Sequence, residues 1–358
     1  MVLAAQSSPR ARLGAGGRLG PLASAVSASA SGVPDFGSDV QATLAWAAAV
    51  GPRIAAEPSV AAVWEALAVA ARHDVAAARI LEPHVDALRI LAEAADEGLD
   101  VPLADVAAGP GSTWGVFAAE GRGVRLAAEV REGRWMLDGT KPWCSLAGLL
   151  SHALVTAWVD DERRGLFAVS LRAPGVAAHQ GPWHSRGLPD VVSAPVDFRA
   201  VPAVPVGDPG WYLRRPGFAR GGMGVAACWW GGATALLDPL ARAAAADGAD
   251  QIAQVHLGRA DSALWGARAA LAEAAEIVDG GGAEDEALLA ARVRAVVADA
   301  AEDVLSESDR ALGPLPLVAD LAHARRTADL RIYLRQHHGD RDAAGRARRI
   351  IAAGGAGS

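Results

Sequence analysis

The sequence predicts a multidomain protein of helices and strands: an N-terminal helical domain, a small β-sandwich or β-barrel in the middle, and a C-terminal four-helix bundle. Apolar residues recur at helical spacing up to about residue 105 and again after about residue 217. Between these regions the pattern changes to short apolar runs bounded by glycine, proline and aspartate, which is typical of strands. The 358 residues are 51% hydrophobic and 21% charged, a globular composition with enough length for several domains.

The first 34 residues carry no acidic side chain and are rich in alanine, serine and glycine. Transit peptides share this composition, but the segment lacks a clear amphipathic apolar face. We therefore expect residues 1–35 to form a disordered extension.

The N-terminal helical domain is expected over residues 36–110. Its longest helical pattern begins at Asp74, a residue type that caps helices, and ends at Gly98. Pro83 interrupts this pattern, so we expect either two helices or a kink there.

The middle domain is expected over residues 111–208, where five short runs have the composition of strands. A charged cluster at 160–164 marks an exposed hairpin turn between two of them. So many short strands in about ninety residues indicate a small sandwich or barrel. The runs are 123–130, 133–139, 152–161, 165–171 and 194–201.

The C-terminal domain is expected over residues 209–358. Four long helical patterns separated by glycine-rich breaks predict an antiparallel bundle, and residues 352–358 (AAGGAGS) should fray. The order of helices, strands and helices excludes a doubly wound nucleotide-binding fold, because no strand is followed by a glycine-rich turn and a helix. The expected helices span about 218–247, 251–279, 284–312 and 320–336.

Charge and cysteine content narrow the classes of partner. The formal net charge is −7 and no basic stripe interrupts it, which argues against nucleic acid as a partner. The uncharged run 221–237 is short and rich in glycine, so we interpret it as a buried helix rather than a membrane span. Cys144 and Cys228 lack metal-ligand spacing and form no disulfide framework, which favours a reducing cytoplasm and no metal site.

Four collinear segments resemble the acyl-CoA dehydrogenase family. Residues 137–145 (LDGTKPWCS) are similar to that family's motif of a glycine, a lysine, a tryptophan and a final threonine or serine at the end of a β-domain strand. The other segments are similar to the end of its β domain, its first bundle helix and its final helix. They are 184–211, 217–227 and 320–334, and the similarity runs in order from about residue 74 to 341.

The resemblance implies an FAD-dependent oxidoreductase whose substrate is a small molecule, an acyl-CoA thioester. In the family a carboxylate removes the α proton while the flavin accepts the β hydride. The alignment places Asp320 at the position of the catalytic glutamate, and the related nitroalkane oxidases use aspartate in this role. The alternative is that Asp320 only caps the last helix. Family members are usually homodimers or homotetramers built through the bundle.

The resemblance also implies cofactor and substrate contacts. Trp143 and Ser145 match flavin contacts, although Trp143 is alternatively a core residue at the end of a strand. Thr113 falls at a threonine of the flavin loop. Arg220 matches an arginine near the acyl-CoA site, with a structural ion pair as the alternative. His338, at the family's last cofactor turn, implies adenine or ribose contacts, unless it belongs to a solvated helix end.

Two departures from the family concern the flavin diphosphate. The region that carries an arginine and a phenylalanine in the family reads AADGADQIAQ at 245–254, and its glycine loop reads GPLP at 313–316. Three hypotheses therefore stand: an acyl-CoA dehydrogenase-like enzyme, a flavin oxidase or monooxygenase acting on a substrate without CoA, and a non-catalytic relative that has lost flavin. Both enzyme hypotheses require Asp320 and the Trp143–Ser145 end of the β domain to meet at one enclosed cavity.

Overall fold

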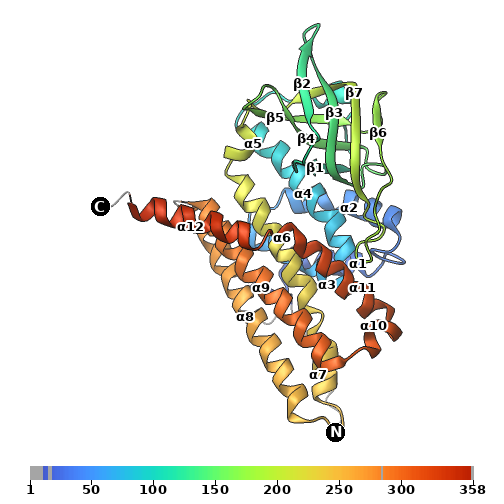
Figure 1. Ribbon diagram of the computed structural model, residues 1–358, viewed down its shortest axis with the longest axis vertical. Helices are drawn as coiled ribbons and strands as arrows, with labels where there is room; N and C mark the ends of the chain where they lie inside the picture. The colour runs from blue at the N-terminus through green and yellow to red at the C-terminus, as the bar shows by residue number, and fades with distance from the viewer. Residues whose placement is uncertain (1–10, 15–17, 284, 356–358) are drawn as a thin grey trace.

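The computed structural model of the chain describes residues 11–14, 18–283 and 285–355. Figure 1 shows the strands gathered at one end of the molecule and the long helices of the C-terminal half at the other, with α3, α4 and α6 between them. This arrangement confirms the predicted order of helices, a small β domain and helices.

Four helices precede the strands, and a side chain caps three of them. Asp39, Ser59 and Asp74 each accept a hydrogen bond from a backbone N–H of the first turn that follows. A 3₁₀ helix, η1 (Leu103–Val106), leads into the strands. The helices are α1 (Pro21–Ala30), α2 (Val40–Ala55), α3 (Val60–His73) and α4 (Val75–Asp96).

The prediction of a disordered extension over residues 1–35 is wrong for its described part. Helix α1 lies in this segment and buries Leu22 and Val26. The carboxylate of Glu65 on α3 accepts hydrogen bonds from the backbone N–H groups of Leu13 (3.1 Å) and Gly20 (2.9 Å). The small side chains that suggested disorder here allow close helix packing. Residues 1–10 and 15–17 lie outside the described residues.

Helix α4 runs through Pro83 as one helix, so the first of the two predicted alternatives, two separate helices, is wrong. The helix packs against strand β1 on one side and against α2, α3 and α6 on the others. This packing stabilises the helix despite the hydrogen bond that the proline cannot donate. As a result, Arg79, Glu82 and Asp86 lie along one continuous helix.

The strands confirm the predicted barrel. The hydrogen-bonded order β4–β2–β3–β7–β5 returns to β4 through an antiparallel β4–β5 pair, which closes the ring. β1 adds to β4 in parallel, and β6 adds to β7. The strands are β1 (Trp114–Phe117), β2 (Leu126–Arg131), β3 (Arg134–Ser145), β4 (His152–Trp158), β5 (Arg164–Ser170), β6 (Val176–Ala178) and β7 (Ser193–Pro205).

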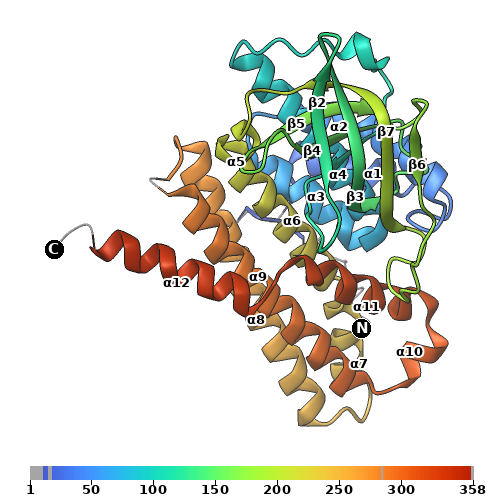
Figure 2. The same cartoon turned by 45° about the horizontal axis from the view of Figure 1, so that its top comes forward.

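The C-terminal half is helical as predicted, but its helices are divided differently. The first bundle helix is broken after Thr234 into α6 and α7, and the short helices α5 and α10 precede the first and the last bundle helix. An additional helix, α12, follows the predicted end of the bundle and extends to Gly355, into the segment that was expected to fray. Both views show α12 projecting from the body of the molecule (Figures 1 and 2). The helices are α5 (Trp211–Arg214), α6 (Gly217–Thr234), α7 (Leu237–Ala244), α8 (Gln251–Asp279), α9 (Glu286–Leu312), α10 (Leu315–Ala319), α11 (Leu321–Tyr333), η2 (Leu334–Gln336) and α12 (Asp340–Gly355).

Helix α6 lies at the centre of the helical core and contacts α3, α4, α8 and α9. Its glycines allow this, because a Cβ at Gly231 would lie 2.0 Å from the carbonyl oxygen of Ala68 on α3. Trp229 and Trp230 of the same helix are both buried. Among the described residues, no helix combines the length and apolarity needed to cross a membrane.

Candidate functional site

The end of strand β3 is tied to helix α4 by a buried polar contact. Ser145 Oγ accepts a hydrogen bond from Arg79 Nη2 at 2.9 Å and shares another, of 2.7 Å, with Ser193 Oγ. The Arg79 guanidinium also lies over the ring of Tyr333, 5.7 Å from its centroid. The β domain, α4 and α11 therefore meet at one arginine.

Glu82 follows Arg79 by one helical turn, and its carboxylate lies 3.9 Å from the guanidinium. Tyr333 donates a hydrogen bond of 3.5 Å to Glu82 Oε2. Burial raises the pKa of Glu82 to about 7, although the nearby Arg79 charge opposes the shift. A carboxyl group with a pKa near neutrality both accepts and returns protons readily, which is the property of a general base or acid.

Glu82 lies in the wall of a cavity of about 480 Å³ enclosed mainly by α3, α4 and α6. A cavity of this size is typical of small-molecule sites. Asp86 lies one turn further along the same wall, and burial raises its pKa as well, against the opposing charge of Arg215. The apolar part of the wall comes from Val60, Val63, Trp64, Leu67 and Val85.

The cavity beside Glu82 carries more negative than positive charge. Five carboxylates and three arginines line it. Two of these arginines are already paired: Arg215 with Glu93 at 2.7 Å, and Arg220 with Glu286 at 2.8 Å. Arg220 thus lies at the cavity and forms the structural ion pair that was its alternative interpretation.

Trp143 is not the core residue that its position at the end of a strand suggested as an alternative. Its side chain is 60% exposed, and its backbone has φ +59°, a left-handed conformation that costs energy for a bulky residue. The following residues, Cys144 and Ser145, are buried. The strand end therefore holds an exposed indole two residues before the buried Ser145.

Thr113 and His338 form their hydrogen bonds with residues outside this strand end. Thr113 binds Ser151 through its backbone and its hydroxyl and so joins the start of β1 to the start of β4. His338 is exposed, and its backbone N–H donates to Asp342 Oδ2 at 2.9 Å. Their cofactor contacts stay predictions.

Asp320 caps helix α11, since its carboxylate accepts a hydrogen bond of 3.0 Å from the backbone N–H of His323. It lines a second, smaller cavity of about 350 Å³, whereas Glu82 lines the larger one. Neither Trp143 nor Ser145 lines either of these two cavities. Asp320 and the strand end therefore do not meet at one cavity, and these contacts do not support the enzyme hypotheses in the form that has Asp320 as the base.

The carboxylate that the structure links to Ser145 is Glu82, through Arg79. The sequence holds a signal for it: Arg79 and Glu82 are three residues apart and begin a row of charged residues that continues at helical spacing through Asp86. Charged residues on a buried face need partners, so such a pair marks either an ion pair or a site.

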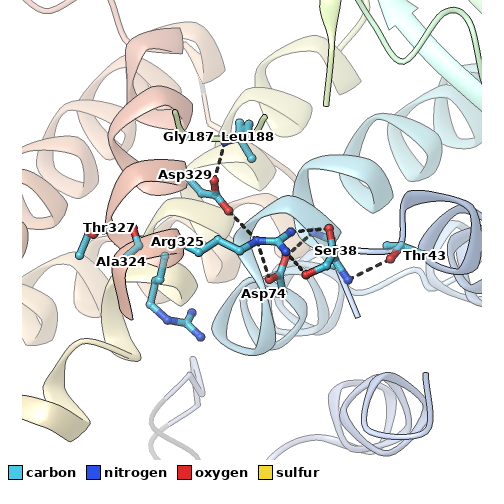
Figure 3. Close-up of polar contacts among 12 residues, drawn as sticks. Ser38, Thr43, Asp74, Gly187, Leu188, Ala324, Arg325, Thr327 and Asp329 are labelled. Atoms are coloured by element: carbon cyan, nitrogen blue, oxygen red, sulfur yellow. Dashed lines mark hydrogen bonds and ion pairs between the residues drawn. The ribbon is translucent and has the colours of Figure 1, made fainter. Parts of the chain in front are cut away.

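A second arginine fixes helix α11 against the rest of the molecule. Figure 3 shows Arg325 reaching between Asp74, the cap of α4, and Asp329. Its Nε lies 3.8 Å from Asp74 Oδ2 and 3.4 Å from Asp329 Oδ2, and its Nη groups donate to Ser38 Oγ and the Gly37 carbonyl. Asp329 also accepts from the backbone N–H of Leu188 in the loop before β7.

Within the described ranges, no three histidine, cysteine, aspartate or glutamate side chains come close enough together to hold a metal ion. The free thiols of Cys144 and Cys228 are buried.

Solved structures of similar shape cover nearly the whole chain. FMN-bound dibenzothiophene monooxygenase from Paenibacillus sp. A11-2 has a TM-score of 0.74 and 17% identity, over 92% of this chain and 96% of that one. Nitrososynthase from Micromonospora carbonacea var. africana has 0.68 and 18%, over 87% and 89%. Butyryl-CoA dehydrogenase from Megasphaera elsdenii has 0.74 and 16%, over 93% and 99%. This chain has the acyl-CoA dehydrogenase fold.

Neither a family model nor a curated protein sequence matches the chain. The chain shares the acyl-CoA dehydrogenase fold with solved structures whose sequences are less than one fifth identical to its own. At this distance, fold similarity carries no residue roles, and the roles must be argued from the contacts of this chain.

Glu82 gives the chain a defined pH response. Its folded pKa of about 7 exceeds the ordinary value of 4.5, so the folded state holds a proton that the unfolded state has released. The contribution of the Glu82 carboxyl to the free energy of unfolding is largest below about pH 4.5. It falls as pH rises towards 7, by up to about 3 kcal/mol. We expect Glu82→Gln to remove this fall, as measured by urea unfolding at pH 5 and pH 8. The matched control is Glu162→Gln on an exposed turn, and an unchanged profile in Glu82→Gln would contradict the assignment.

Proposed function

We propose that this protein is a flavin-dependent oxidoreductase that acts on a small molecule, with Glu82 as its proton-accepting group. The observation that carries the proposal is the position of Glu82, a carboxyl with a pKa near 7 between a ligand-sized cavity and the Ser145 end of β3. Perturbed carboxyls on cavity walls are characteristic of catalytic sites. The FMN-bound state of a protein with the same fold supports the flavin.

The end of β3 fits a flavin ring in two respects. The exposed indole of Trp143 offers a flat aromatic surface, and aromatic rings stack favourably on one another. The hydroxyls of Ser145 and Ser193 would exchange the hydrogen bond that they share for bonds to the flavin, and Arg79 brings a positive charge to the same strand end. Bound flavin would supply the redox chemistry, while these groups would orient it and set the charge around it.

The chain favours FMN over the FAD that the family resemblance implies. The family's diphosphate contacts are missing at 245–254, and Pro314 and Pro316 remove backbone N–H groups from the turn after α9 and from the start of α10. FMN has neither a diphosphate bridge nor an adenine, so these losses do not affect its binding.

The larger cavity favours a neutral or cationic substrate over an acyl-CoA thioester. Its excess of carboxylates would repel the phosphate groups of CoA at close range. This supports an oxidase or monooxygenase acting on a small molecule without CoA. The homodimer or homotetramer implied by the resemblance stays a prediction.

Glu82 is placed to accept a proton from a substrate in this cavity. Tyr333 and Arg79 lie on the other side of its carboxyl and hold it in position, since each contacts Oε2. Burial of the carboxyl among α3, α4 and α6 disfavours its charged form, which keeps the carboxylate basic.

Flavin binding tests the proposal first. We expect the purified chain to bind FMN, seen as flavin absorbance that survives gel filtration. Trp143→Ala should weaken binding about tenfold, because it removes the stacking surface. Trp265→Ala is the matched control, since Trp265 is 64% exposed on α8, away from the strand end. A chain that stays colourless with excess FMN and FAD would instead support the hypothesis of a non-catalytic relative. In that case the Ser145 hydroxyl would keep its present hydrogen bonds to Arg79 and Ser193.

Turnover tests the role of Glu82. We expect an oxygen-uptake screen of small amines and neutral aromatics with the FMN-loaded chain to find substrates, when it is run with and without NADH and a flavin reductase that supply the electrons a monooxygenase needs. Glu82→Gln should keep its flavin and lose roughly 100-fold or more in rate, as is usual when a general base is removed. Glu162→Gln should keep full rate. Reduction of the bound flavin by butyryl-CoA would contradict the proposed substrate class, and full activity of Glu82→Gln would contradict its role.

A further inference from the structure

The smaller cavity, lined by residues of α1, α3, α7 and α11, is rich in cationic groups. Three arginines line it, together with two aspartates, which leaves one formal positive charge when the two histidines of its wall are neutral. The larger cavity has the opposite balance. The lining side chains that carry this argument are Arg72, His73, Arg242, Ala322, His323 and Arg326.

Two of these arginines are held in place by the fold. Arg326 donates hydrogen bonds to the carbonyl oxygens of Ala71 (3.3 Å) and His73 (3.0 Å) at the C-terminal end of α3. Arg72 Nη2 donates to Asp238 Oδ2 at 2.6 Å. Positioned guanidinium groups lose little side-chain freedom when an anion arrives, so they bind it more effectively than mobile ones.

The cavity also holds a buried donor that lacks a partner within the described parts of the chain. Arg72 Nη1 is buried without a hydrogen bond, and His323 lines the same cavity. A buried donor left without an acceptor costs about 1–3 kcal/mol. An acceptor in this cavity would remove that cost.

We propose that the smaller cavity binds the phosphoryl group of a small molecule, with Arg72, Arg242 and His323 as its contacts. A phosphoryl group carries several acceptor oxygens and a negative charge, which matches a forked guanidinium donor and a second arginine. The volume of about 350 Å³ exceeds what one phosphate fills, so it holds a further part of the ligand. This site is separate from the cavity of Glu82 and does not depend on flavin binding.

Calorimetric titration of the full chain with inorganic pyrophosphate, in a buffer free of phosphate, tests this site. We expect one binding site. Arg242→Gln should weaken it about five- to tenfold, because it removes one charged contact at an exposed position. Arg292→Gln, the same charge change at an exposed position of α9 outside the cavity, is the matched control and should bind as the wild type does.

A second variant separates the cavity from the general charge of the molecule. Ala322→Trp fills the cavity wall without changing charge and should abolish pyrophosphate binding while the circular dichroism spectrum stays native. Absence of binding by the wild type at millimolar pyrophosphate would overturn the proposal. Equal weakening by Arg242→Gln and Arg292→Gln, or unchanged binding by Ala322→Trp, would also overturn it.

Discussion

The hydrogen bond between Arg79 and Ser145 is the contact on which the rest of the site depends. A guanidinium with only 14% of its side chain exposed must find partners, and here they come from three parts of the chain: Ser145 of β3, Glu82 of α4 and the ring of Tyr333 on α11. These contacts hold the β domain and the helices in one arrangement. They also keep Glu82 enclosed, and enclosure is what raises its pKa.

The two cavities of the helical region have opposite charge, and each follows from the helix ends and faces that surround it. The smaller cavity lies at the C-terminal end of α3, where exposed carbonyl groups attract Arg326. The larger cavity follows one face of α4, whose carboxylates recur at helical spacing opposite the glycines of α6. The separation of charge supports two different ligands, a neutral or cationic substrate and a phosphorylated small molecule.

Much of the fold could be predicted because its signals are local. Apolar periodicity and glycine breaks placed the helix at 251–279 and the short strands, and the structure has α8 and the barrel there. Helix α1 was missed because alanine and serine pack closely without an obvious apolar face. The site was harder to predict. The alignment located Asp320, but it does not show which carboxyl group the fold buries. The packing of α3, α6 and α11 is what distinguishes Glu82 from the other carboxylates of α4, and a backbone turn is what exposes the ring of Trp143.

The central claim is that Arg79 couples the cofactor end of β3 to the carboxyl in the larger cavity. FMN affinity measured from pH 5.5 to 8.5, for the wild type and Glu82→Gln, tests it most directly. The wild-type affinity should fall as pH rises through about 7, because the Glu82 carboxylate then competes with the cofactor for Arg79. Glu82→Gln should lack this fall. Identical pH profiles in the two chains, or no FMN binding at any pH, would contradict the account.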